Sequence, residues 1–320
     1  MRKTHFALTL LATALLASCG SDDDEIGLPD PSSGRGSAAA ELASAEDVAE
    51  KARGDVDCPA DIDSDERAEG APVDDVLGVR PGLTYDEAVN AVLCSHEMLV
   101  MLPVTRGFDL QTYGHTLRQG FTARFAEREK SSKEYMDEIS GSFSARSGNA
   151  VTQDMLPGQS KWYVTAMGMP EAERVIHVAR EEWFEEGRNP TMASAEQALI
   201  KKYGPPSRNY LQSARTLAWI YDPRGRLATE TSPLFSSCTA SSDPDGGSNF
   251  SPDCGIVVGA QIWPLQANTD LAAYMQVGVV DSAVGYQALT TVEQALQALD
   301  SKRKADEVSE AQENADAPEL

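Results

Sequence analysis

Side chains at catalytic or metal-binding spacing are scarce in this sequence. His96, His115 and His177 are scattered, without carboxylates at ligand spacing. Nucleophile-elbow, His-Glu-x-x-His, phosphate-loop and dinucleotide signatures are absent. Cys94 with His96 is one alternative, as a thiol nucleophile or metal pair, but two ligands are too few for zinc. The sequence therefore predicts no catalytic residue, no metal site and no cofactor.

Residues 243–249 have the composition of a calcium-binding loop, Asp-Pro-Asp-Gly-Gly-Ser-Asn. An EF-hand loop ends in a glutamate that binds the ion through both carboxylate oxygens. Cys254 stands at that position, so the strongest ligand is missing. We interpret the segment as a solvated turn, with calcium binding as the alternative.

The first 18 residues have the pattern of an export signal peptide. Arg2 and Lys3 form a short positive segment, and residues 6–16 are apolar but too few to span a membrane. Residues 16–19, Leu-Ala-Ser-Cys, resemble the lipobox of bacterial lipoproteins, where the leader is cut before an acylated cysteine. The resemblance implies that Cys19 carries the lipid; a plain secretory signal is the alternative.

Residues 19–71 are rich in Asp, Glu, Ser, Gly, Pro and Ala and contain no aromatic residue. Such a segment buries too little apolar surface to offset the entropy lost on ordering. The sequence predicts a flexible acidic tether between the membrane and a folded body. Acyl chains on Cys19 would hold the protein at the membrane, since each buried methylene contributes about 0.8 kcal/mol.

Gly20 follows the predicted lipid anchor. In many enterobacterial lipoproteins an aspartate at that position retains the protein in the inner membrane. By this analogy we expect the outer membrane, with the body facing the periplasm. The acidic residues 22–25 resemble those of some surface-exposed lipoproteins, which leaves surface exposure as the alternative.

The charge of the chain restricts its partners. Fifty Asp and Glu residues outnumber 27 Lys and Arg residues, giving a net charge of −23. Nucleic-acid phosphates and anionic lipid headgroups would repel such a body. We therefore expect a protein partner in the cell envelope, membrane attachment through the acyl chains alone, and no nucleic-acid binding.

Four cysteines remain once Cys19 is assigned to the lipid, an even number in an oxidising compartment. Three pairings are possible. We favour Cys238 with Cys254, because they enclose a polar loop without a core of its own. Closing a loop of that size contributes about 3 kcal/mol in the chain-entropy model. Cys58 then pairs with Cys94.

Two segments have helix signals. Thr84 and Glu87 have capping-box spacing ahead of an apolar stripe that ends at Cys94. Residues 191–203 form a second amphipathic pattern, which Gly204-Pro205-Pro206 stops. Residues 216–221 follow as an alternating, aromatic strand.

These segments resemble the SmpA/OmlA family, small outer-membrane lipoproteins of the β-barrel assembly machinery. The family motif Gly-x-x-Pro-Gly-Met-Thr is similar to the segment containing Gly78, Pro81, Gly82 and Thr84. The later family pattern, a Gly-x-Pro stop followed by Trp-x-Tyr, is similar to Gly204, Pro205, Trp219 and Tyr221. The two pieces are separated here, and each lacks part of the pattern. The resemblance implies a helix packed on a β-meander.

The remaining pattern predicts an α+β fold with short helices on antiparallel β-meanders, in two related helix-strand units. Residues 161–168 and 174–184 form a predicted hairpin, and 254–263 and 274–281 are further strands. Residues 105–155 are either a helix lined by Phe121, Phe125, Tyr135 and Ile139 or a partly ordered connection. The predicted organisation is a signal peptide (1–18), the tether (19–71), two α+β units (72–155 and 156–300, the second ending in a helix from Thr290) and a disordered charged tail (301–320).

Two non-catalytic functions fit these features, and an unrecognised enzymatic activity is the third alternative. The first is a lipid-anchored periplasmic binding or scaffold protein, linked by resemblance to outer-membrane assembly, whose sheet edge or aromatic face holds a protein partner. Trp162, Tyr163, Trp183, Trp219 and Trp263 all fall on predicted strands, where aromatic residues fill the core or form such a face. The alternative is an inhibitor of a basic envelope or cell-wall hydrolase.

Overall fold

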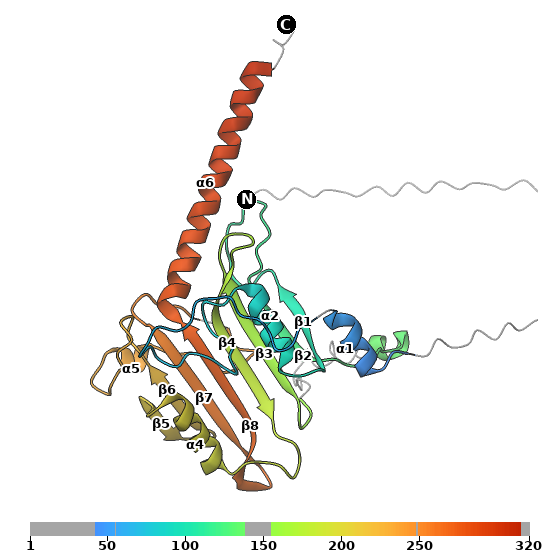
Figure 1. Ribbon diagram of the computed structural model, residues 1–320, viewed down its shortest axis with the longest axis vertical. Helices are drawn as coiled ribbons and strands as arrows, with labels where there is room; N and C mark the ends of the chain where they lie inside the picture. Colours follow the sequence, from blue (N-terminus) through green and yellow to red (C-terminus); the bar gives the residue numbers. More distant parts are fainter. Residues whose placement is uncertain (1–41, 55, 138–154, 248, 315–320) are drawn as a thin grey trace, which may run out of the picture. The chain divides into compact units, whose positions relative to one another are not determined.

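The computed structural model describes residues 42–314, apart from 55, 138–154 and 248 (Figure 1). A single antiparallel sheet has the strand order β1-β2-β3-β4-β8-β7-β6-β5. The strands are β1 (Leu99–Val104), β2 (Gly120–Phe125), β3 (Ser160–Met167), β4 (Arg174–Trp183), β5 (Arg208–Leu211), β6 (Arg215–Ile220), β7 (Ile256–Leu265) and β8 (Asn268–Asp281). The predicted α+β class is confirmed. The signal peptide, Cys19 and residues 315–320 lie outside the described residues.

Two capped helices cover one face of the sheet, which we call the helix face. α2 (Tyr85–Cys94) contacts β1 to β4, and α4 (Met192–Tyr203) contacts β6 to β8 (Figure 1). The predicted capping box of Thr84 and Glu87 is present, and Thr191 caps α4. Buried residues of both helices and of the helix face, including Trp162 and Trp219, form one hydrophobic cluster.

The predicted division into two α+β units differs from the structure. β2, from the first predicted unit, pairs with β3, from the second, through Phe121 opposite Val164 and Ala123 opposite Trp162. All four residues are buried. A two-stranded hairpin alone cannot bury one face adequately, so β1 and β2 extend the larger sheet. Phe121 and Phe125 lie on β2 rather than on a helix or a partly ordered connection.

Part of the predicted tether is folded against the body. α1 (Ala45–Arg53) begins with a capping box at Ser44 and contacts β1. Arg53 Nη1 donates hydrogen bonds to the carbonyl oxygens of Leu93, His96 and Leu99. These tertiary hydrogen bonds and the burial of Ala49 offset the entropy lost on ordering, which the polar composition alone does not. The prediction of a flexible tether up to residue 71 is therefore wrong for this segment.

Glu87 links the later part of that segment to α2. Its carboxylate accepts hydrogen bonds from the backbone N–H and hydroxyl of Thr84 and from those of Ser64. Burial alone would raise the pKa of Glu87, but these bonds outweigh it and hold the pKa at about 2. One ionised carboxylate thus caps α2 and fixes residue 64.

The last helix is longer than predicted. α6 (Ser282–Asn314) buries Val292 and Leu296 against Met167 and Ile176 of the sheet. It starts at Ser282, eight residues before Thr290. The predicted disordered tail is wrong for residues 301–314, which continue α6 although every one of them is exposed. These residues contain no Gly or Pro and make helix-spaced ion pairs: Asp300–Lys304 and Arg303–Glu307.

A segment that we call the strap, residues 240–242, crosses the face opposite the helix face. Gly278 lies between Val277 and Val279 of the helix-face cluster, so it belongs to this opposite face. A Cβ added to Gly278 would lie 1.9 Å from the Ser241 carbonyl oxygen. The His177 Nε2–H donates to that same oxygen at 2.9 Å. Burial lowers the pKa of His177 to about 4, against the opposing effect of this bond, so its ring is neutral at neutral pH.

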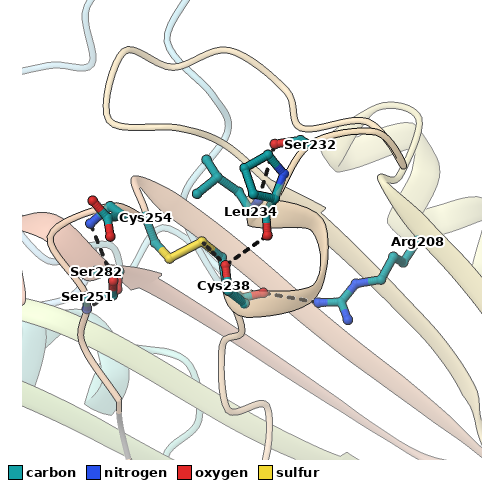
Figure 2. The surroundings of a disulfide bond; sticks show 10 residues. Arg208, Ser232, Leu234, Cys238, Ser251, Cys254 and Ser282 are labelled. Atoms are coloured by element: carbon teal, nitrogen blue, oxygen red, sulfur yellow. Dashed lines mark hydrogen bonds between the residues drawn. A yellow bond between two sulfur atoms is a disulfide. The ribbon is translucent and has the colours of Figure 1, made fainter.

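The Cys238–Cys254 disulfide holds the base of the strap (Figure 2). Arg208 donates to the Cys238 carbonyl oxygen, and the Ser251 N–H donates to the Ser282 hydroxyl at the start of α6 (Figure 2). Both cysteines are buried, in a small cluster with Ile220, Val257 and Val280. The disulfide thus joins the strap, the sheet and α6.

Gly278→Ala is expected to displace the strap, because no side chain fits between β8 and the Ser241 carbonyl. We expect the free energy of unfolding to fall by about 1–3 kcal/mol, as for overpacking of a rigid contact. Gly247→Ala is the matched control, since a Cβ there meets nothing within 4 Å. Urea unfolding measures both; equal stability of the two variants would contradict the contact.

Glu87→Gln is expected to lower the free energy of unfolding by about 1–2 kcal/mol at pH 7, as for loss of a helix cap. The folded pKa lies below the ordinary value of 4.5, so this stabilisation is complete above about pH 4.5 and disappears as the pH falls towards 2. Urea unfolding across this range should show the difference between wild type and variant shrinking. The exposed Glu97→Gln serves as control, with a change below about 0.5 kcal/mol at every pH.

Candidate functional site

A row of polar side chains crosses the face opposite the helix face. Lys161, Glu181, Gln276 and Gln261 are cross-strand neighbours on β3, β4, β8 and β7. Glu181 and Gln276 are buried, at 6% and 8% exposure. Glu181 accepts from the Gln276 amide at 2.6 Å and from the Trp183 Nε1–H at 2.7 Å. Each carboxylate oxygen therefore has a donor, and the row is fixed in place.

Three aromatic rings lie beside the polar row. Trp183, Tyr274 and Trp263 are cross-strand neighbours on β4, β8 and β7. The Trp183 and Tyr274 rings are stacked, with centroids 4.8 Å apart and planes 3° apart. Trp263 stacks on the other side of Tyr274 at 5.7 Å and 14°. All three side chains are half-buried. We call these three residues the aromatic strip.

A cleft of about 510 Å³ borders the aromatic strip. Gln159 lines it, and the Gln159 carbonyl accepts from the Trp183 backbone N–H. Lys161, Arg124, Trp162 and Asp245 also line it. Its volume falls within the range of ligand pockets, about 300–1,000 Å³. None of the three rings lines the cleft, and the backbone bond between Gln159 and Trp183 connects the strip to it.

Lys161 is the charged group between the cleft and the polar row. Its ammonium forms an ion pair with Asp245, which follows the strap. Burial would lower the pKa of Lys161, but the bond to Asp245 and the nearby Glu181 carboxylate outweigh it and raise the pKa above its ordinary value. Lys161 therefore stays protonated at physiological pH.

The structure pairs the cysteines as predicted. Cys58 is bonded to Cys94, and Cys238 to Cys254, with Cα atoms 5.5 and 5.7 Å apart. Cys94 is therefore no free thiol nucleophile beside His96. Within the described residues, no group of three or more His, Cys, Asp or Glu side chains is placed to hold a metal ion.

The two motif segments, separated by more than 100 residues, meet in the structure. The loop before α2 holds Asp75, which accepts from Lys202 Nζ at 2.7 Å. The Asp75 carbonyl accepts from the Tyr203 hydroxyl at 2.8 Å. Trp219 donates from Nε1 to the Gly204 carbonyl at 2.7 Å and packs against the Tyr203 ring. Asp75 and Tyr203 are thus the link between the two motifs.

The other motif residues have backbone roles. Gly78 has a φ of +85° and donates its N–H to the Asp75 carboxylate, which closes a tight turn. Gly82, with a φ of +92°, donates to the Val175 carbonyl and connects the loop to β4. Pro81 is buried, and Pro205 follows the end of α4. Tyr221 packs at the margin of the helix-face cluster.

Four of the five predicted strand aromatics lie in the core or in the aromatic strip, and the fifth, Tyr163, is half-buried beside the His177 ring. Trp162 and Trp219 are buried on the helix face, and Trp183 and Trp263 lie on the opposite face. Sequence reasoning did not single out Tyr274 or the buried Glu181. Tyr274 and Glu181 alternate along their strands with Met275 and with Arg180 and Glu182, which would have placed them on the opposite face. Strand pairing, however, decides which residues become neighbours.

Comparison with known protein families, curated proteins and solved structures finds no match to this chain. The structure defines the class: an α+β protein with two disulfides and helices on an eight-stranded antiparallel sheet. No helix within the described ranges is long and apolar enough to cross a membrane.

Glu181→Ala is expected to destabilise the aromatic strip, because the Trp183 and Gln276 donors lose their acceptor. We expect a loss of about 1–3 kcal/mol in the free energy of unfolding and a changed near-ultraviolet circular dichroism spectrum. Glu181→Gln should largely restore both, since the Gln276 amide can turn to accept. The exposed Glu186→Gln is the control. An unchanged spectrum in Glu181→Ala would show that the carboxylate does not position the rings.

Proposed function

We propose that this chain is a lipid-anchored binding or scaffold protein of the bacterial cell envelope, facing the periplasm from the outer membrane. Acyl chains on Cys19 hold it at the membrane, and residues up to about 41 connect that anchor to the folded body. The leader and the lipobox-like Leu-Ala-Ser-Cys support the anchor. The proposal assigns no catalytic step to the chain.

The aromatic strip carries the proposal for binding. Trp and Tyr are enriched at the centres of protein interfaces, where they supply large, rigid contact areas. Because the three rings stack on one another, most of their faces are already occupied. A sugar ring would need those faces, whereas a protein surface can pack on the ring edges and enter the neighbouring cleft. We therefore propose a protein partner.

The net charge of the protein restricts the class of protein partner further. With a net charge of −23, the protein attracts basic surfaces and repels acidic ones. The resemblance of the motif segments to the SmpA/OmlA family favours a component of outer-membrane assembly as the partner. The contact between those segments at Asp75 and Tyr203 supports this reading, because it joins the two pieces into one local unit.

Crosslinking in intact cells, followed by identification of the attached proteins, tests the proposal. We expect Trp183→Ala and Trp263→Ala to reduce recovery of the partner about tenfold or more, as for truncation of interface anchors. Tyr286→Ala, an exposed aromatic on α6, is the matched control and should leave recovery unchanged. Cys19→Ser should release the protein from the membrane fraction.

The identity of the crosslinked protein separates the alternatives. Barrel-assembly components support a scaffold role, and a single basic hydrolase supports the inhibitor role. Equal recovery with the two tryptophan variants and the control would exclude the aromatic strip as the binding surface. Membrane retention of Cys19→Ser would exclude the lipid anchor.

A further inference from the structure

A cavity of about 310 Å³ lies on the helix face, away from the aromatic strip. α4 forms one wall, strands β4 and β8 form the floor, and the turn before α2 forms the opposite wall. The lining is predominantly apolar. The apolar lining residues are Val76, Leu77, Phe184, Pro190, Ala195, Ala198, Leu199, Met275 and Val277.

The charged groups of the cavity wall are already paired. Arg180 Nη1 donates to Glu182 at 2.7 Å, and the Arg180 guanidinium lies over the Trp162 ring. Lys202 donates to Asp75 at 2.7 Å. Each cation therefore lies against a carboxylate, and Arg67 shares Asp75 with Lys202. An entering peptide would bring backbone N–H and C=O groups that need new partners, whereas an alkyl chain would not.

Leu77 marks the mouth of the cavity. Its side chain is 58% exposed, and its backbone has a φ of +49°, which is uncommon for a leucine. The turn is held in this shape by the Gly78 N–H, which donates to Asp75, and by the pairing of Val76 with Val79. The motif turn thus places an apolar side chain at the rim of an apolar cavity. Strained backbone of this kind clusters at ligand clamps.

We propose that this cavity binds the alkyl chain of a fatty acyl group, with the chain passing Leu77 and its polar end outside the protein. Burial of the chain supplies the affinity, at about 0.8 kcal/mol for each methylene. The volume lies at the lower end of the range for ligand pockets, so it holds one part of a single chain. This inference goes beyond the proposed function and uses the other face of the sheet.

Dodecanoate binding to the full chain carrying Cys19→Ser, which removes acylation, tests the proposal by isothermal titration calorimetry. We expect saturable binding of one equivalent. Ala198→Phe should weaken it at least about tenfold, because the new ring fills the cavity from an exposed helix position. Ala193→Phe, equally exposed on α4 but outside the cavity lining, is the matched control and should bind as the parent does.

Absence of binding in the parent, or equal affinity in Ala198→Phe and the parent, would overturn the proposal. Trp183→Ala should bind dodecanoate normally, so failure here is distinguishable from failure of the partner-binding surface. Amide hydrogen exchange of the protein bound to lipid vesicles identifies where the alkyl chain in the cavity comes from. Slower exchange of α4 in the acylated protein than in Cys19→Ser identifies the protein's own anchor, and equal exchange identifies a membrane lipid.

Discussion

The contact of the strap with Gly278 is the constraint on which the rest of the structure depends. Backbone can approach a strand this closely only where the strand has no side chain, and Gly259 and Gly278 are cross-strand neighbours at that point. The Cys238–Cys254 disulfide and the bond from His177 to Ser241 hold the strap there. The strap covers the row of Gly259 and Gly278 directly. The polar row and the aromatic strip lie further along the same strands, beyond the strap, and form a separate region.

The two faces of the sheet therefore have different roles. The helix face is closed by α2 and α4 and contains the main hydrophobic cluster, with a cavity remaining beside α4. The opposite face is covered by α6 and by the strap in part, and Gln159 connects its half-buried rings to a cleft. Strand alternation produces this division: Arg180 and Glu182 line the cavity, while Glu181 between them positions Trp183. One strand thus serves both candidate binding regions.

Local signals in the sequence predicted local structure well. Thr84 and Glu87 form the predicted capping box, the β3–β4 hairpin is present, and the cysteines pair as expected. Composition was a poorer guide. Residues 44–64 and 301–314 have the polar character of flexible segments. Tertiary hydrogen bonds of Arg53 and Glu87 nevertheless fix the N-terminal one of these two segments. Ion pairs and residues with high helix propensity stabilise residues 301–314 as part of α6.

The sequence by itself determined the α+β class and the helix caps, because each depends on neighbours in the chain. It also favoured the cysteine pairing that the structure has, from a list of three. The lipid site at Cys19 stays a prediction. Only the tertiary structure decided that the strands form one sheet, that Trp183, Tyr274 and Trp263 stack, and that Asp75 meets Tyr203. Those contacts join residues tens to more than a hundred positions apart. Strand order and register, which no local pattern encodes, bring them together.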